Sequence, residues 1–338
     1  MTVLILGGAG YVGSHATDEF LARGYDVAVV DNLSTGHRAA VSDKARFYEG
    51  DIRDKAFLTD VFTKESDIEG VMHFCAYSLI RKSIYQPLMH YTLVDKSKKL
   101  LMCFENHVGG AMLLLDVMHQ FDVKHIVFSS TAGTYPIPKA PPINEIAPRN
   151  RIKSDLTLGE LMIRETAATD MTYVALRYFN VAGAKHDGSI GEAHKNETHL
   201  IPIILQVALG QRDKVMIYGD DYQTEDGTCV RDYIGMTDLI EAHIKALEHL
   251  KAGGQSDTFN LGTRTGYSNL QVLETARQVT GHAIPAEIGP RRIGDPDALV
   301  ANSNKADKLL DWRPTESLTD IISNAWQWHQ KHPHGYRN

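Results

Sequence analysis

The chain is poor in cysteine and has no long apolar run. Its three cysteines, Cys75, Cys103 and Cys229, are far apart and show neither zinc-site spacing nor a disulfide framework. This usage is typical of the reducing cytoplasm, so we expect a cytoplasmic protein. No apolar stretch is long enough to span a membrane, and the apolar start of the chain lacks a basic leader, so we expect no membrane association.

Positive charge is also scarce. The 35 Lys and Arg residues are outnumbered by 42 Asp and Glu residues, and the formal net charge is −7. The one local basic run, Lys96-Ser97-Lys98-Lys99, is typical of a solvated helix face. We therefore expect no nucleic-acid partner, and the cysteine spacing gives no reason to expect a metal.

Repeats and low-complexity linkers are absent, and what remains is an alternation of strand and helix signals. Longer segments of helical period separate five apolar runs, at residues 3–6, 27–30, 70–74, 126–129 and 173–177. This alternation predicts an α/β fold, a doubly wound parallel (Rossmann) sheet with helices on both faces.

The composition of the sequence changes after Asn180. Loops rich in Gly, Pro and Asp follow, with helical candidates at 199–209, 238–250 and 270–279 and a tail that contains Trp312, Trp326 and Trp328. We expect a dinucleotide-binding domain over residues 1–180. A smaller mixed α/β substrate domain is expected over residues 181–338, interdependent with the first.

A glycine-rich turn directly follows the first apolar run. Gly7 permits a tight turn, Gly10 lets backbone approach a pyrophosphate, and Gly13 lets the next helix pack closely on the strand. The start of that helix offers unpaired N–H groups to an anion. Asp31 follows the second apolar run, where a carboxylate accepts hydrogen bonds from a ribose 2′-OH and repels a 2′-phosphate. The pattern predicts a bound dinucleotide and favours NAD over NADP.

Polar or small residues follow three further strands, in Phe74-Cys75-Ala76, Ser129-Ser130-Thr131 and Tyr178-Phe179-Asn180. Ligands of open parallel sheets bind outside the carboxyl ends of the strands. We expect these segments to share one rim with the glycine turn.

Taken together, these residues resemble the extended short-chain dehydrogenase/reductase family, and within it the 4-epimerases of UDP-hexoses. The resemblance covers nearly the whole chain. Its motifs are Gly7 to His15, Asp31-Asn32-Leu33-Ser34-Thr35-Gly36, Gly50 to Asp54, Arg177 to Ala184, Tyr218 to Ile234, Asn260-Leu261-Gly262, and Pro290 to Asp295. The segment from Tyr218 to Tyr233 is the most specific, because it lies where sugar-nucleotide enzymes differ.

The resemblance implies a reversible conversion of UDP-galactose into UDP-glucose, with tightly bound NAD as hydride carrier. The implied cofactor residues are Gly7, Gly10, Tyr11, Val12, Gly13, Asp31, Asn32, Ser34, Thr35, Gly36, Asp51, Ile52, Phe74, Cys75, Ala76, Ser129 and Tyr178. The implied UDP-hexose residues are Asn180, His199, Leu200, Tyr218, Arg231, Arg292 and Asp295. The two arginines suit a diphosphate, because guanidinium groups form charge-assisted hydrogen bonds with it.

The family's catalytic Tyr-x-x-x-Lys pair is missing. Thr131 fits the hydroxyl of the proton relay, but counting back from Arg177 places Arg151 and Asp155 at the pair. The other alignment places Leu156 and Glu160 there. Tyr135-Pro136-Ile137-Pro138-Lys139 has the spacing, but its prolines forbid the helix that would align the two side chains, so Tyr135 is expected to shape a loop.

Three interpretations follow from that departure. The first is an active epimerase that uses Thr131, with Asp155 or Glu160 as a weakly supported substitute base. The second is an impaired paralogue that binds NAD and UDP-sugar in a regulatory role. The third, a sugar-nucleotide dehydratase, ranks last because Ala132-Gly133 stands where its acids are usual. The resemblance also implies a homodimer, although about a dozen extra residues, 92–104, fall in one of the pairing helices.

Overall fold

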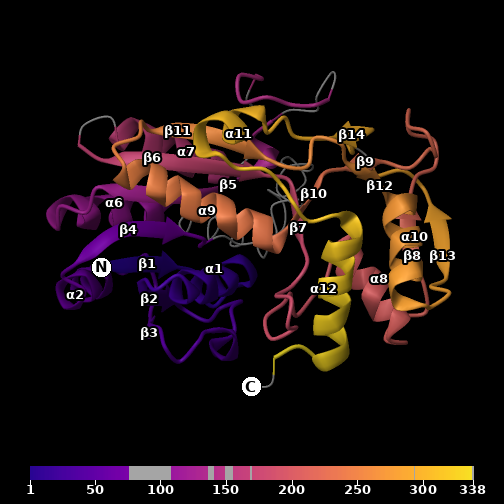
Figure 1. Ribbon diagram of the computed structural model, residues 1–338, viewed down its shortest axis with the longest axis horizontal. Coiled ribbons are helices and arrows are strands. Elements are labelled where there is room, and N and C mark those ends of the chain that lie inside the picture. Colours follow the sequence, from indigo (N-terminus) through magenta and orange to yellow (C-terminus); the bar gives the residue numbers. More distant parts are fainter. Residues whose placement is uncertain (76–107, 136–140, 149–154, 168–169, 293, 337–338) are drawn as a thin grey trace, which may run out of the picture. The chain divides into compact units, whose positions relative to one another are not determined.

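The computed structural model describes residues 1–75, 108–135, 141–148, 155–167, 170–292 and 294–336 (Figure 1). They form two compact units. The first contains Met1–Pro136, Pro148–Arg177 and His243–Phe259, and the second contains Ile137–Ala147, Tyr178–Ala242 and Asn260–Asn338. The division of function at residue 180 stays a prediction.

The first unit is built on a seven-stranded sheet with the order β11-β6-β5-β4-β1-β2-β3. The pairs β1–β2, β1–β4, β2–β3 and β4–β5 are parallel. The strands are β1 (Thr2–Leu6), β2 (Asp26–Asp31), β3 (Arg46–Glu49), β4 (Ile68–His73), β5 (His125–Thr131), β6 (Thr172–Tyr178) and β11 (Asp257–Leu261). This sheet confirms the predicted fold class and all five predicted strands.

Two strands of the sheet were not predicted. β3 is an edge strand with the sequence Arg-Phe-Tyr-Glu, whose residues are half-buried or exposed, so it has no apolar run. β11 comes late in the chain, and only its last three residues are buried. Short strands of this kind depend on their neighbours in the sheet rather than on their own sequence.

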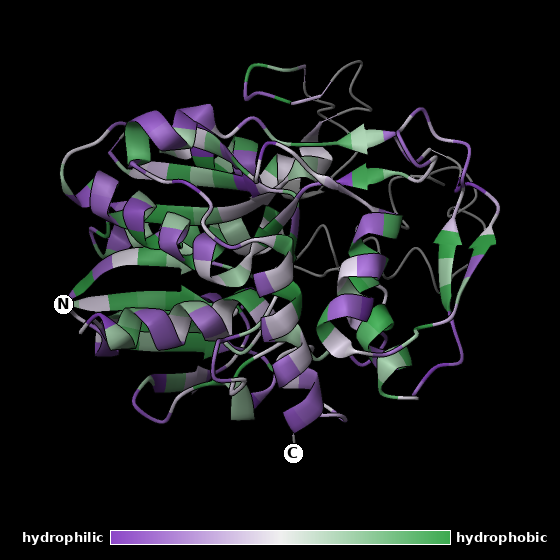
Figure 2. Cartoon of the chain, turned by 45° about the vertical axis from the view of Figure 1, so that its right-hand side comes forward, coloured by the Kyte–Doolittle hydropathy of each residue, from purple (hydrophilic) through white to green (hydrophobic). Residues whose placement is uncertain are grey.

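Helices and short 3₁₀ turns accompany this sheet. They are α1 (Tyr11–Ala22), η1 (Arg38–Ala40), α2 (Lys55–Lys64), α6 (Gly110–Gln120), η3 (Ala132–Thr134), α7 (Asp155–Thr166) and α9 (Met236–Lys251), whose residues divide between the units at His243. α2 begins where the Asp54 side chain accepts the N–H groups of Ala56 and Phe57. The strands are largely hydrophobic (Figure 2), and Leu4, Phe62 and Leu114 are among the fully buried residues of their core.

The second unit packs α8 (Leu200–Ala208), α10 (Asn269–Thr280) and α12 (Leu318–Lys331) against one another (Figure 1). The first two match predicted helices. Capping boxes begin α10 at Ser268 and α12 at Ser317. The remaining elements are β7 (Asn180–Ala182), β8 (Val215–Tyr218), β9 (Val230–Arg231), β10 (Tyr233–Gly235), β12 (Tyr267–Ser268), β13 (Ala286–Gly289), β14 (Ala298–Leu299) and α11 (Asn304–Leu310).

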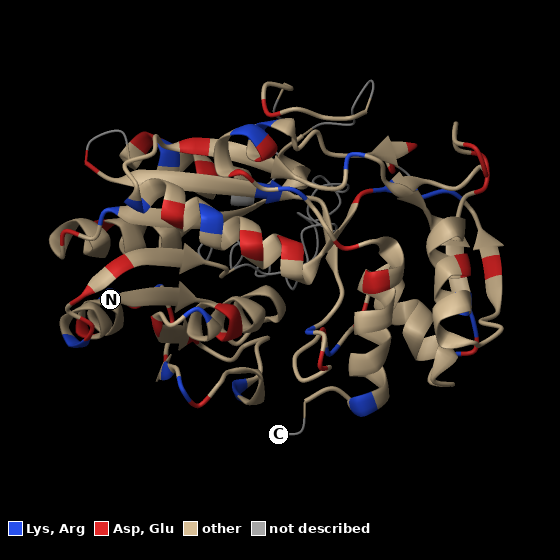
Figure 3. Ribbon diagram, in the orientation of Figure 1, with Lys and Arg blue, Asp and Glu red and all other residues tan. Residues whose placement is uncertain are grey.

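The aromatic tail is buried in the second unit. Trp312 and Trp328 are each 1% exposed, and Trp326 joins the core formed by α8, α10 and α12. Lys and Arg are dispersed along both units and alternate with Asp and Glu (Figure 3). Among the described residues, no helix has both the length and the apolar content that a membrane span requires.

Candidate functional site

The glycine turn joins β1 to α1 in a space that excludes side chains. Gly7 has a φ of 78°, and a Cβ there would lie 2.9 Å from the backbone of Phe74. A Cβ on Gly13 would lie 2.2 Å from the Gly7 carbonyl oxygen. Gly10 is the N-cap of α1 and provides no side-chain hydrogen bond. The first turn of α1 therefore keeps the anion-binding character of a bare helix N-terminus.

Asp31 ends β2 and is fixed by the same turn. It is 8% exposed, and its two carboxylate oxygens accept the N–H of Ala9 at 3.0 Å and of Leu33 at 2.8 Å. Burial raises the pKa of Asp31, while these amides act in the opposite direction. Each oxygen retains a lone pair for a ribose hydroxyl.

The Asp51 carboxylate of the first unit is fixed by hydrogen bonds from two neighbouring side chains. Arg53 donates to both of its oxygens, at 2.8 and 2.6 Å, and Asn32 donates to one of them at 3.0 Å. The Arg53 guanidinium holds the pKa of Asp51 well below its usual range. Ile52 is buried, and a Cβ on Gly110 would lie 2.7 Å from its Cδ1 atom.

The ends of β4 and β5 carry further predicted cofactor residues of this unit. Ser129 Oγ lies 2.9 Å from His243 Nε2, and the Phe74 ring centre is 4.9 Å from that of His243. Burial raises the pKa of the Cys75 thiol well above its ordinary value. Thr131 is half-buried, and its hydroxyl oxygen accepts the Gly133 N–H at 3.1 Å, which leaves the hydroxyl proton to donate.

The segment expected to hold the catalytic pair contains a buried charge network instead. Arg177 and Glu160 are 1% and 2% exposed and are joined by two hydrogen bonds, of which Nε to Oε2 is 2.8 Å. Ser130 donates to Glu160 Oε2 at 2.6 Å, and Arg177 donates to the Tyr135 hydroxyl at 2.8 Å. Burial alone would lower the pKa of Arg177, but the Glu160 carboxylate raises it overall.

This network bears on the suggested substitute bases. Both oxygens of Glu160 are engaged by Arg177, so its carboxylate serves to neutralise a buried guanidinium. Tyr135 lies at the end of η3 and not in a helix, as expected from its prolines. Asp155 begins α7. The residues Ala76, 92–104 and Arg151 lie outside the described part of the chain.

The residues expected to bind UDP-hexose lie in the second unit. Tyr218 ends β8, and its ring centre is 3.8 Å from the Arg292 guanidinium. Arg231 is 5% exposed and donates to the carbonyl oxygens of Val230 and Pro296, with Asp295 at 3.8 Å. The structure therefore groups these residues in two pairs, Tyr218 with Arg292 and Arg231 with Asp295.

Asn180 and His199 stand at other element boundaries of this unit. Asn180 begins β7, which pairs with β10 in parallel, and its N–H donates to the Asp232 carbonyl oxygen. His199 is the N-cap of α8, followed by Leu200. Its neighbours Glu192, His194 and Glu197 were not predicted from the sequence, because cysteine spacing was the only signal considered for metal binding.

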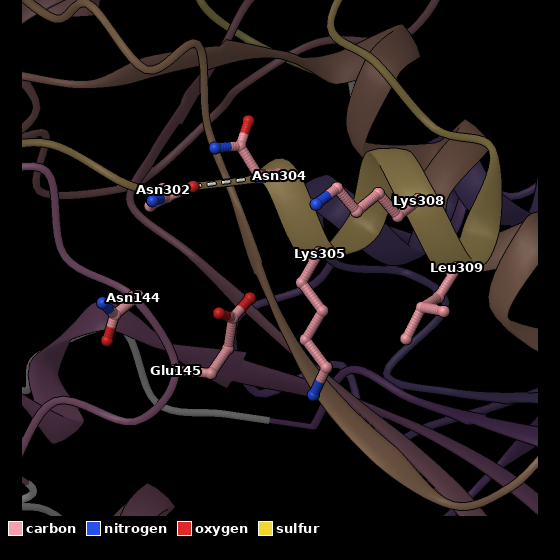
Figure 4. A pocket seen from close by; sticks show the side chains of 7 residues that line it. All are labelled: Asn144, Glu145, Asn302, Asn304, Lys305, Lys308 and Leu309. Carbon is pink, nitrogen blue, oxygen red and sulfur yellow. Dashed lines mark hydrogen bonds between the residues drawn. The ribbon is translucent and has the colours of Figure 1, made fainter.

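A pocket in the second unit lies beside α11 and has a volume of about 360 Å³ (Figure 4). Asn302 Oδ1 accepts the Asn304 N–H in its wall, and Lys305 and Glu145 also line it. None of the predicted site residues lines this pocket, so we assign it no part in the site.

Comparison with known proteins identifies the family. The model of the NAD dependent epimerase/dehydratase family matches residues 3–262. The chain belongs to this family. A UDP-glucose 4-epimerase of Lacticaseibacillus casei is 51% identical over 341 residues, which cover 99% of either chain.

Solved structures agree with the sequence comparison. One crystal structure of a UDP-glucose 4-epimerase superposes with a TM-score of 0.92 at 48% identity and covers all of both chains. Another, from Bifidobacterium longum in complex with NAD⁺ and UDP, has a TM-score of 0.87 at 35% identity and covers 99% of this chain and 100% of its own.

Proposed function

We propose that the protein is a UDP-glucose 4-epimerase that interconverts UDP-galactose and UDP-glucose with NAD as its cofactor. The observation that carries this proposal is the 51% identity to a UDP-glucose 4-epimerase over 99% of either chain. The relatives reported above are named as 4-epimerases, which favours the epimerase over a regulatory paralogue or a dehydratase.

The first unit has the geometry that NAD needs. The space at Gly7 and Gly13 admits backbone but no Cβ, and Asp31 is buried with its carboxylate fixed by two amides. When bound, NAD supplies a carrier that takes a hydride from sugar C4 and returns it. We assign the pyrophosphate to the N–H groups of the glycine turn and the adenosine ribose to Asp31.

The second unit supplies positive charge for the UDP moiety. Arg231 and Arg292 are assigned to the diphosphate, and Asn180, His199, Leu200, Tyr218 and Asp295 complete the predicted set. Arg231 is preorganised, since two carbonyl oxygens hold its guanidinium. Thr131 supplies the hydroxyl that donates to, or accepts from, the reacting sugar oxygen.

The decisive experiment incubates the purified full chain with UDP-galactose and no added NAD, and measures UDP-glucose by NMR. We expect conversion, and about one NAD released per chain on denaturation. Failure to convert at high enzyme concentration, with NAD and UDP-galactose both shown to be bound, would contradict the proposal.

A matched pair of variants tests the role of Thr131. Thr131→Val removes the half-buried hydroxyl and should lower kcat by about 10²-fold or more, in the range for a proton-transfer group. Thr134→Val, three residues away in η3, removes a buried hydroxyl that has no hydrogen-bond partner among the described residues and should leave kcat unchanged. Equal activity of both variants would remove Thr131 from the reaction.

We also propose that the protein is a cytoplasmic homodimer. Support for a dimer comes from α6 and α7, which flank a hollow of about 360 Å³ lined by Met112, Met162 and Met171. Met112 is 53% exposed. Sedimentation of the purified chain should give twice the monomer mass, and Met112→Glu should shift the mass to that of one chain.

A further inference from the structure

Four side chains of metal-binding type converge in the second unit, just before α8. Glu192, His194, Glu197 and His199 each bring one ligand atom into a group whose atoms all lie within 4.8 Å of one another. His194 Nδ1 is 3.1 Å from Glu192 Oε1 and 3.2 Å from Glu197 Oε2. His199 Nδ1 is 2.5 Å from the same Glu192 oxygen and 3.8 Å from Glu197 Oε1.

These separations are close to those of a tetrahedral metal site. Bonds of about 2.0–2.2 Å to nitrogen and oxygen place neighbouring ligands of Zn²⁺ about 3.3–3.6 Å apart. The three distances between proposed ligand atoms, 3.1, 3.2 and 2.5 Å, are shorter than that range, so small side-chain rotations that widen the group would bring the atoms to it. We propose that Glu192, His194, Glu197 and His199 form a binding site for one divalent transition-metal ion, with Zn²⁺ the ion that two imidazoles and two carboxylates suit best.

Hydrogen bonds from neighbouring groups support the Glu197 carboxylate and the main chain of Glu192. Glu197 Oε1 accepts the N–H groups of Thr198 and His199, each at 2.7 Å, which leaves Oε2 for His194. Trp328 Nε1 donates to the Glu192 carbonyl oxygen at 3.1 Å. Such supporting hydrogen bonds orient metal ligands and reduce the cost of binding.

The charges of the group also favour a cation. Glu192 is 5% exposed, and within the described part of the chain both carboxylates are ion-paired with imidazoles and not with lysine or arginine. The ring centres of His194 and His199 are 5.3 Å apart, so two imidazolium charges would repel each other. One divalent ion would instead neutralise two carboxylates beside two neutral rings.

The place of the group in the fold suggests what the ion does. His199 is the N-cap of α8, and the Gly191 backbone lies so close to Trp328 that a Cβ there would be 2.3 Å from its Cγ atom. An ion bound by residues 192 to 199 would therefore fix the start of α8 to the segment that packs on α12. This inference does not rest on which sugar the protein uses, and it assigns the His199 imidazole to the ion rather than to UDP-hexose.

The test is binding of Co²⁺ alone to the full chain after treatment with a chelator. We expect one equivalent of Co²⁺, with the strong visible absorption of a tetrahedral complex, displaced by Zn²⁺. His194→Asn and Glu197→Gln should each weaken the affinity at least tenfold. His119→Asn should not, although His119 also faces a carboxylate, that of Asp170 at 3.1 Å. Zn²⁺ should raise the unfolding temperature of the wild type but not of His194→Asn.

Several outcomes would overturn the inference. These are no saturable Co²⁺ binding, weak absorption typical of surface-bound ions, or equal affinity of wild type and His194→Asn. Near-UV circular dichroism of each variant establishes that it is folded before binding is compared, and the two variants provide independent tests. Because the readout is a spectrum and not epimerase activity, failure here and failure of the proposed function are distinguished.

Discussion

The turn after β1 and the surroundings of α7 belong to the same unit, and both were expected to serve one reaction, yet they are built in opposite ways. Around Gly7 and Gly13 backbone meets backbone, and the contacts leave no room for a single additional carbon. Around α7 the contacts are made by long side chains, with Arg177 bound to Glu160 and Tyr135. The structure of the first region requires close backbone packing with no side chain between, whereas that of the second requires a buried arginine to be paired with a carboxylate.

We expect the largest loss of stability at the buried Glu160–Arg177 ion pair. Glu160→Ala leaves the Arg177 guanidinium buried without its carboxylate, and should lower the free energy of unfolding by about 3–5 kcal/mol. Urea denaturation followed by circular dichroism measures this change. A loss below about 1 kcal/mol would show that water or another group compensates Arg177.

A double variant sharpens the distinction between a structural and a chemical role. Glu160→Leu with Arg177→Met removes both charges, and replacing a buried ion pair by apolar side chains is often nearly neutral. Stability should therefore recover most of the loss measured for Glu160→Ala. If kcat recovers with it, the pair is structural, whereas a stable but inactive double variant would assign the pair a part in the reaction.

We expect the next largest effect, on both stability and NAD binding, at Gly13 in the glycine turn. Gly13→Ala places a Cβ 2.2 Å from a backbone carbonyl oxygen, and the forced shift should cost about 1–3 kcal/mol and reduce the NAD content of the purified protein. Gly109→Ala is the control, because no atom of the described residues lies within 4 Å of its Cβ and its φ of −61° suits alanine. Equal NAD content in the two variants would contradict this account of the turn.

The same contrast explains what the sequence could predict. The glycine turn and Asp31 were predictable, because a strand, a turn and a helix in fixed order determine the backbone locally. The Glu160–Arg177 pair and the contact of Ser129 with His243, 114 residues away, depend on neighbours that only the folded chain brings together. β3 and β11 were missed for the same reason, since their pairing comes from the sheet.

A smaller effect is expected at Asp31. Asp31→Asn keeps the shape but weakens two charge-assisted amide contacts and removes the repulsion of a 2′-phosphate, so the share of NADP bound in competition with NAD should rise about tenfold. Asp26→Asn, at the exposed start of the same strand, is the matched control and should leave the ratio unchanged. Mass spectrometry of the released cofactor measures the ratio of NADP to NAD bound by each of the two variants. An unchanged ratio in Asp31→Asn would place the ribose elsewhere.

The smallest effect is expected at Leu299 in the second unit. It pairs with Arg231 across β14 and β9, and its moderate size suits an N-acetyl group on the sugar. Leu299→Tyr should lower the rate with UDP-N-acetylgalactosamine several-fold and change that with UDP-galactose little. A wild type that turns over only the smaller sugar would count against this assignment.

The position of β11 in the sheet has a consequence for biosynthesis. This strand occupies the edge beside β6, but its residues, Asp257–Leu261, leave the ribosome long after those of the other six strands. Until then β6 is the exposed margin of an unfinished sheet, open to pairing with another nascent polypeptide. The sheet of the first unit is therefore completed only after Leu261 has been synthesised, and nascent chains stalled before Asp257 should depend on chaperones for protection.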